Sequence, residues 1–192
     1  MYYSICSVND FNALSLKEVS GLLSSQQKEY INSLSDFRRK QSLGARVLLN
    51  NIISSHYTDI SLNVLYSNEN GKPYLKNTDY FISMTHSVDF VGCAVADRPI
   101  GIDIQCFTGF SQNLISRVCT PNEEIYIKEN GNNYFYLIWS LKESYKKAFD
   151  TSFAKTVKLS FVKDGQISAP SEDVKIEYGL ADSYAWSVCT KK

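Results

Sequence analysis

The chain has 192 residues, of which 44% are hydrophobic and 21% are charged. A chain of this length buries about 70% of the surface that its unfolded form exposes, so it needs no disulfide or metal merely to fold. Its 20 basic and 20 acidic residues give a formal net charge of zero, which argues against a broad basic surface. We therefore expect no nucleic-acid partner, while a small basic pocket remains compatible with this balance.

The cysteines and the apolar runs indicate the class of protein. The five cysteines are widely spread and form no C-x-x-C pair: Cys6, Cys93, Cys106, Cys119 and Cys189. This pattern favours reduced thiols over a disulfide framework or a zinc site. The opening MYYSICSVNDF does not look like a signal peptide, and no apolar stretch approaches the ~18 residues of a membrane span. The sequence thus predicts a cytoplasmic protein without a membrane partner, and we expect a monomer.

The first half reads as a strand, a helical region and further strands. Residues 2–8 predict a strand, and the apolar spacing over 15–57 predicts helices. Turn-forming residues fill 67–73, and short apolar runs predict a strand meander over 81–86, 90–96 and 100–105. One local charge imbalance stands out, because four basic residues lie between Phe37 and Thr58 with no acid among them: Arg38, Arg39, Lys40 and Arg46.

The second half repeats the order of helices followed by strands. Helices are predicted over 111–118, after a cap at Thr120-Pro121, and over Tyr134–Phe149. Strands are predicted over 157–162, 166–169, 174–178 and 184–190, with a turn at Asp164-Gly165. This order predicts an α+β fold of two similar halves, residues 1–98 and 99–192.

Two motifs of the second half carry candidate chemistry. In Ile100-Gly101-Ile102-Asp103-Ile104-Gln105, Asp103 sits among isoleucines, where a strand disfavours an aspartate. It is either an exposed or backbone-held carboxylate, or a ligand of a hard cation such as Mg²⁺. In the helix Trp139–Lys147, Glu143 and Lys147 are four residues apart, which is typical of a solvated ion pair worth about 0.3–0.5 kcal/mol.

A third candidate is His86, at the end of Phe81–His86 and before a tight turn. A lone histidine is usually structural, but Thr85 beside it and Gly71-Lys72-Pro73 upstream are compatible with a phosphate site. The sequence contains no G-x-x-x-x-G-K-[ST] loop, G-x-G-x-x-G fingerprint, G-x-S-x-G elbow or H-E-x-x-H motif. The usual nucleotide-binding, hydrolase and zincin interpretations therefore have no support.

Taken together in their order, these segments resemble the Sfp-like 4′-phosphopantetheinyl transferases. The segments are the G-K-P-Y turn at 71–74, F-x-x-x-[ST]-H-S at 81–87, G-I-D-I-x at 101–105 and W-S-x-K-E-S-x-x-K at 139–147. The last two are highly specific, and the resemblance extends from the basic helix near Arg38 to at least Lys147. It implies two pseudo-twofold halves, each a small antiparallel sheet packed against helices, with the active site at their interface.

The resemblance implies an enzyme that transfers the phosphopantetheine arm of coenzyme A to a serine of an apo acyl or peptidyl carrier protein and releases 3′,5′-ADP. Asp103 and Glu143 match the Mg²⁺ ligands, with Gln105 as a weaker one, and Glu143 also matches a general base. Lys147 matches the lysine that neutralises the pyrophosphate. The residues expected to bind coenzyme A are Lys28, Lys40, Lys72, Thr85, His86 and Lys147. Glu123 lies where the family often has an acid near the metal, although a glutamate there also suits a helix start.

Two departures from the family pattern leave alternatives open. Gln105 stands where many members carry a second acid, and Asp150-Thr151-Ser152-Phe153 replaces a glycine-bearing stretch. A non-catalytic homologue that binds coenzyme A, or a carrier-protein interaction module, therefore remains the alternative to an active transferase.

Overall fold

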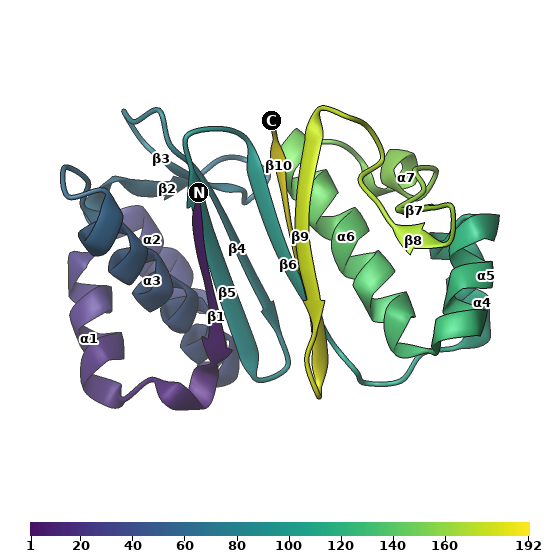
Figure 1. Ribbon diagram of the computed structural model, residues 1–192. Coiled ribbons are helices and arrows are strands. Elements are labelled where there is room, and N and C mark those ends of the chain that lie inside the picture. The colour runs from purple at the N-terminus through teal and green to yellow at the C-terminus, as the bar shows by residue number, and fades with distance from the viewer. The chain divides into compact units, whose positions relative to one another are not determined.

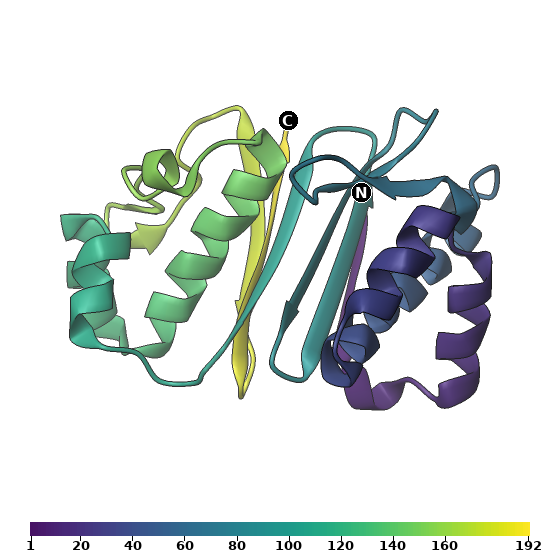
Figure 2. The same cartoon turned by 180° about the vertical axis from the view of Figure 1, so that it is seen from behind.

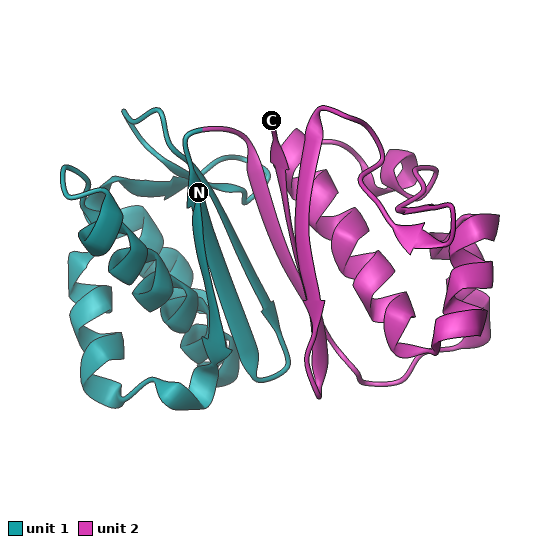
Figure 3. Cartoon of the chain, in the orientation of Figure 1, with its two compact units in different colours: residues 1–97 teal, residues 98–192 magenta.

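The computed structural model describes residues 1–192, which divide into two compact units, Met1–Asp97 and Arg98–Lys192 (Figure 3). Each unit combines a three-stranded antiparallel sheet with helices, so the predicted α+β class with two such halves is confirmed. None of the helices is both long enough and apolar enough to cross a membrane.

In unit 1 one long helix, α3, packs against the sheet β1-β5-β4, and α1 and α2 pack on that helix (Figure 1). Its elements are β1 (Tyr2–Ser7), a 3-10 turn (Val8–Asp10), α1 (Ala13–Leu22), α2 (Ser25–Ser33), α3 (Asp36–His56), a second 3-10 turn (Leu62–Val64), β2 (Leu65–Ser67), β3 (Pro73–Leu75), β4 (Phe81–Ser87) and β5 (Phe90–Ala96). The expected opening strand, helical region, turn and first two strands of the meander are all present. β2 and β3 form a separate hairpin around the predicted turn.

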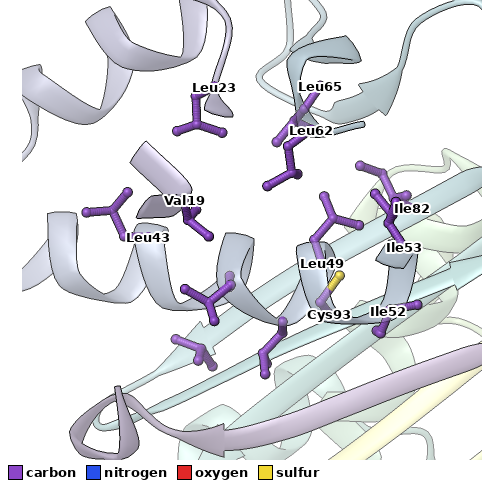
Figure 4. Close-up of a cluster of buried hydrophobic side chains, with 14 of the residues drawn as sticks. Val19, Leu23, Leu43, Leu49, Ile52, Ile53, Leu62, Leu65, Ile82 and Cys93 are labelled. Atoms are coloured by element: carbon purple, nitrogen blue, oxygen red, sulfur yellow. The ribbon is translucent and has the colours of Figure 1, made fainter. Parts of the chain in front are cut away.

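The core of unit 1 forms between α3 and the sheet. One face of α3 is apolar along most of its length, and this face packs on β5. Figure 4 shows Leu43, Leu49 and Ile53 of α3 pointing into the same cluster as Ile82 of β4 and Cys93 of β5. This packing fixes α3 relative to β4, which carries Thr85 and His86 near its end.

Unit 2 has the sheet β6-β10-β9 and four helices (Figure 2). Its elements are β6 (Ile100–Cys106), α4 (Gln112–Val118), α5 (Pro121–Asn130), α6 (Asn133–Phe149), α7 (Phe153–Thr156), β7 (Val162–Lys163), β8 (Gln166–Ile167), β9 (Val174–Leu180) and β10 (Tyr184–Lys191). The long helix α6 packs along β6 and β10. β6 thus pairs with β10, so the predicted meander of three strands is wrong at its third strand.

The strand expected over 157–162 is also wrong. Residues 153–156 form the short helix α7, and only Val162–Lys163 pair, in a hairpin with Gln166–Ile167 around the predicted Asp164-Gly165 turn. The alternating apolar residues suggested a strand, but side chains satisfy this backbone instead. The amide of Phe161 donates to the Glu123 carboxylate at 2.8 Å, and the carbonyl of Leu159 accepts from Lys142 at 2.6 Å.

Candidate functional site

The candidate site of unit 2 is built around Asp103 in the middle of β6. This residue is only 4% exposed. Its Oδ1 accepts a hydrogen bond from Lys147 Nζ at 2.7 Å, and its Oδ2 accepts one from Gln105 Nε2 at 2.7 Å. Lys147 Nζ donates in addition to the carbonyl of Ile102 at 2.9 Å. The structure therefore brings three sequence-predicted residues together, Asp103, Gln105 and Lys147.

Gly101 explains how α6 comes close enough to β6 for this contact. A Cβ at position 101 would lie 1.9 Å from the Ser144 carbonyl oxygen and 2.9 Å from Lys147 Cβ. No side chain fits in that space, so the glycine of the G-I-D-I segment permits the close approach of helix and strand. The same approach sets Lys147 beside Asp103.

The serines of the W-S-x-K-E-S segment fasten α6 to the sheet. Ser140 donates to the backbone carbonyl of Asp103 at 3.1 Å, and both Ser140 and Ser144 lie 2.8 Å from the Ser187 hydroxyl on β10. All three serines are fully buried, and Ser187 is the register partner of Asp103. Because buried hydroxyls need partners, this chain of small polar side chains fixes α6 against β6 and β10.

Glu143 lies one helical turn before Lys147 on α6, but the two do not form the expected i,i+4 pair. Glu143 instead pairs with Lys146 at 2.5 Å, and its side chain remains 18% exposed. Lys147 is engaged by Asp103 because α6 presents it to the strand. The Glu143 carboxylate thus lies partly open to solvent and is held only by a neighbouring surface lysine.

Glu123 belongs to a different cluster, buried within unit 2. Its carboxylate pairs with Lys142 at 2.9 Å, and both side chains are fully buried. It also accepts from the amides of Thr120 and Phe161 at 2.7 and 2.8 Å. Glu123 therefore closes the capping box of α5 and joins α5 to α6, which confirms the helix-start interpretation. The family-based expectation of a place near the metal finds no support in these contacts.

Asp103 and Glu143 are the carboxylates available to a hard cation, and both oxygens of Asp103 now accept hydrogen bonds, from Lys147 and from Gln105. Asp103 and Glu143 offer carboxylate oxygens, and no cluster of three or more histidines, cysteines or acids forms a metal cage. Mg²⁺ is commonly held by one or two carboxylates together with water and substrate phosphates, so two carboxylates are enough. Gln105, by contrast, turns its amide nitrogen toward Asp103, so its oxygen would face a metal there only after rotation of the amide.

The cavity of unit 1 has a volume of about 460 Å³ and brings together two other predicted residues. Thr85 and His86 from the end of β4 line it, with Arg46 of α3 and the residues on either side of Lys72. Arg46 is 4% exposed and donates to Gln27 Oε1 and to Ser42. Burial lowers the pKa of the Arg46 guanidinium to about 10, and no acid pairs with it.

The remaining predicted basic residues are not among those that line this cavity. Lys28 Nζ donates to the carbonyl of Gly21 at 3.0 Å, and Lys40 Nζ donates to Asn9 at 3.1 Å. Arg39 donates to the carbonyls of Ile31, Asn32 and Leu34 at the end of α2. The basic run that the sequence shows as one cluster is therefore divided among several structural contacts.

The sequence did not reveal a contact between Arg38 and His86. Arg38 Nη1 lies 2.9 Å from His86 Nδ1 and also donates to Gln41 Oε1 at 3.1 Å. Gln41 in turn donates to the carbonyl of Val88, which has a left-handed φ of 46° in the β4–β5 turn. The only signal in the sequence was the acid-free run of basic residues, which does not show which of them reaches the strand.

The thiols of Cys6, Cys119 and Cys189 are not suited to nucleophilic chemistry. All five cysteines are free, and four of them are buried. Burial raises the pKa of Cys119 and of Cys189 to about 12, and that of Cys6 to about 11. Because only the thiolate is a good nucleophile, these thiols are unreactive at neutral pH.

Comparisons with known proteins point to one family. A family model described as the 4′-phosphopantetheinyl transferase superfamily matches residues 99–191. The 4′-phosphopantetheinyl transferase psf-1 of Bacillus pumilus is 30% identical over 180 residues, which cover 85% of this chain and 76% of that protein. The 4′-phosphopantetheinyl transferase Sfp of Bacillus subtilis (strain 168) is 30% identical over 158 residues, 74% of this chain and 70% of its own.

Solved structures match as well. A holo-(acyl-carrier-protein) synthase from Bacillus anthracis str. Ames, in complex with CoA (3′,5′-ADP), aligns with a TM-score of 0.41 at 17% identity. The match covers 48% of this chain and 90% of that one.

Proposed function

Because the chain belongs to the 4′-phosphopantetheinyl transferase family, we propose that it converts an apo acyl or peptidyl carrier protein into the holo form, with coenzyme A as donor and Mg²⁺ as cofactor. The observation that carries the proposal is the Asp103–Lys147 contact between β6 and α6, with Glu143 one turn away on the same helix. In this proposal the Lys147 ammonium, together with a Mg²⁺ held by Asp103 and Glu143, would supply the positive charge that a pyrophosphate requires.

The proposed reaction moves a phosphopantetheine group from one oxygen to another. The carrier serine oxygen bonds to the phosphorus next to pantetheine, and the bond from this phosphorus to the bridging pyrophosphate oxygen breaks. The serine proton passes to Glu143, directly or through water, and 3′,5′-ADP departs with the electron pair of the broken bond. Enzymes assist such transfers mainly by positioning the reactants and stabilising charge on the phosphate oxygens.

Lys147 would stabilise the negative charge of the pyrophosphate directly, and Asp103 and Glu143 would do so only by holding Mg²⁺. The Lys147 ammonium has three donors, of which Asp103 and the Ile102 carbonyl take two, so one remains for a pyrophosphate oxygen. Asp103 and Glu143 would hold the Mg²⁺, which when bound supplies positive charge to the pyrophosphate. Gln105 would keep Asp103 oriented by its 2.7 Å hydrogen bond rather than bind the metal through its oxygen.

Unit 1 would supply the residues that bind the adenosine and its 3′-phosphate. Thr85 and His86 are the best placed for this role because they line the 460 Å³ cavity. Lys72, between two residues of the cavity wall, is assigned to the same ligand. Lys28 and Lys40 would first have to leave their contacts with Gly21 and Asn9, so their contribution is expected to be smaller.

The test is a loading assay read by intact mass. The protein is incubated with coenzyme A, Mg²⁺ and each of several apo carrier proteins, and each accepted carrier gains one phosphopantetheine. Asp103→Ala and Glu143→Ala are each expected to abolish the mass gain while the circular dichroism spectrum stays that of the folded protein. The proposal fails if every carrier stays apo while a transferase of known activity loads them.

A non-catalytic protein that binds coenzyme A is the second candidate. It is motivated by Gln105, whose amide nitrogen faces Asp103 where many relatives have an acid, and by Asp150, which has a left-handed φ of 51° where glycine is favoured. Calorimetry that finds coenzyme A binding to a protein without transfer activity would favour this candidate. A plain interaction domain would show neither binding nor transfer.

A further inference from the structure

Ser187 on β10 is a buried polar residue that neither sequence motif of the candidate site contains. It is fully buried and is the register partner of Asp103 on β6. Its hydroxyl lies 2.8 Å from the Ser140 hydroxyl and 2.8 Å from the Ser144 hydroxyl, and these two serines lie one helical turn apart on α6. Because β10 is the central strand of its sheet, this one hydroxyl joins the middle of the sheet to the helix.

Counting protons shows that Ser187 links the other two serines. A hydroxyl has one proton to donate, whereas a carbonyl oxygen can only accept. The Ser140 hydroxyl reaches the Asp103 carbonyl at 3.1 Å, and the Ser144 hydroxyl reaches the Leu141 carbonyl at 3.1 Å. The protons can run toward either carbonyl, and in both cases Ser187 donates to one serine and accepts from the other. Removing its hydroxyl therefore takes a buried partner from both serines.

This chain of hydroxyls acts on the stretch of β6 that carries the candidate carboxylate. Ser140 contacts the carbonyl of Asp103, while Lys147 contacts the carbonyl of Ile102 at 2.9 Å and the Asp103 carboxylate at 2.7 Å. Two consecutive carbonyls of β6 thus hold α6. Glu143 belongs to the same turn of α6, directly before Ser144. The position of the Glu143 carboxylate relative to Asp103 therefore depends on how α6 is held at this point.

A second buried hydroxyl on β10 lacks this connection. Thr190 is 4% exposed, and its hydroxyl donates to the carbonyl of Pro99 at 2.8 Å. Its register partner is Ile100, the first residue of β6. Thr190 therefore stabilises the end of the sheet and takes no part in the chain of hydroxyls that reaches Asp103.

We propose that Ser187 is a positioning residue of the transfer reaction, because it sets the position of α6 relative to Asp103. The same contact places Glu143 and Lys147, which α6 carries. Ser187 acts only through these residues, since it is buried beneath them and its hydroxyl contacts other serines. The inference rests on the proposed function for the reaction, but the position of Asp103 can be measured without any transfer.

The experiment compares Ser187→Ala with Thr190→Val in the full chain. Each variant removes one buried hydroxyl from β10, so each should lower the melting temperature by about 5 °C. Ser187→Ala should lower kcat of carrier loading about tenfold and leave KM for coenzyme A within about twofold, because the reacting groups are misplaced while the ligand contacts remain. Thr190→Val should leave both constants within about twofold of the wild type, because it leaves α6 in place.

A milder variant and a spectroscopic signal complete the test. Ser187→Cys keeps a side chain of similar size with a weak donor and acceptor, so kcat should fall only about threefold. This variant decides the question if Ser187→Ala does not fold. The ¹³C NMR signal of the Asp103 carboxyl carbon, identified with Asp103→Asn, reports on the hydrogen bonds from Lys147 and Gln105. It should move in Ser187→Ala and stay in place in Thr190→Val.

The outcomes separate this inference from the proposed function. Equal losses of kcat in Ser187→Ala and Thr190→Val, or wild-type kcat in both Ser187 variants, overturn the inference and leave the proposed function standing. A wild type that loads no carrier refutes the proposed function, and the carboxyl signal then decides the role of Ser187 by itself. A signal that is the same in the wild type and in Ser187→Ala shows that Ser187 does not position Asp103.

Discussion

Two carboxylate–ammonium pairs of unit 2 differ in burial, and the difference separates a structural pair from a candidate functional one. Glu123 and Lys142 are both fully buried, at 2.9 Å, and their remaining hydrogen bonds go to backbone groups. Asp103 and Lys147 lie at 2.7 Å, but 26% of the lysine side chain is exposed. Both lysines come from one segment of α6, so burial rather than sequence motif tells them apart.

Breaking the buried pair is expected to have the largest effect on stability. Lys142→Met leaves the Glu123 charge without a partner in the interior, which costs about 3–5 kcal/mol in the free energy of unfolding. Urea denaturation measures this loss. The double variant Lys142→Met/Glu123→Gln should lose less unfolding free energy than the two single variants together, because each single change leaves the other group buried without its partner. A loss of unfolding free energy below about 1 kcal/mol in Lys142→Met would show that the buried pair does not stabilise the fold of unit 2.

The next largest effect comes from the glycine that lets α6 reach β6. In Gly101→Ala the new Cβ meets the Ser144 carbonyl at 1.9 Å, so helix and strand must separate, at a cost of about 3 kcal/mol. The separation should also draw Lys147 away from Asp103 and reduce transfer. Gly21→Ala is the matched control, because nothing lies within 4 Å of its added Cβ, and it should raise stability by up to about 1 kcal/mol. Equal thermal stability in the two variants would contradict the close approach.

The contrast between the two pairs also shows what the sequence could predict. The G-I-D-I and W-S-x-K-E-S-x-x-K segments identified the strand, the helix and the residues Asp103 and Lys147. The sequence did not show that Lys142 is the buried lysine, since this depends on α5 and on the loop at Leu159–Phe161, which meet it only in the folded unit. The expected Glu143–Lys147 pair does not form for the same reason. A prediction from helical spacing does not take into account the Asp103 carboxylate on β6, which pairs with Lys147 instead.

Unit 1 shows the same limit for its basic run. The sequence indicated a cation-rich stretch from Arg38 to Arg46, but not how its members are used. Arg39 satisfies carbonyls at the end of α2, Arg46 is buried on Gln27, and Arg38 contacts His86, 48 residues later. Only the packing of α3 against the sheet makes these assignments, and no local pattern encodes it.

Breaking the Asp103–Lys147 pair should reduce activity far more than stability. Lys147→Met removes the ion pair and the bond to the Ile102 carbonyl, but Asp103 keeps its hydrogen bond from Gln105 and the lysine is partly exposed, so the loss in unfolding free energy is about 1–2 kcal/mol. Transfer should fall about 100-fold or more, because a charge-stabilising donor is lost. Initial rates of carrier loading, followed by mass, test this, with Lys17→Ala, at an exposed position of α1, as the charge control. A variant that keeps wild-type rates would remove Lys147 from the proposed machinery.

The smallest effect on stability is expected for Gln105→Glu, which tests whether a cation binds beside Asp103. The new carboxylate would face Asp103 where an amide now donates at 2.7 Å, so the metal-free protein should lose about 0.5–1 kcal/mol by like-charge repulsion. Mg²⁺ should reverse this loss, because the new glutamate adds a carboxylate to Asp103 and Glu143 and so tightens the binding of the ion. Binding to the folded state then raises the melting temperature. Melting curves with and without Mg²⁺ measure both effects. Asp103 and Lys147 remain in the variant. If Mg²⁺ shifts the melting temperature of the variant as little as that of the wild type, position 105 does not face the metal. A larger shift in the variant would place the cation beside Asp103 and position 105.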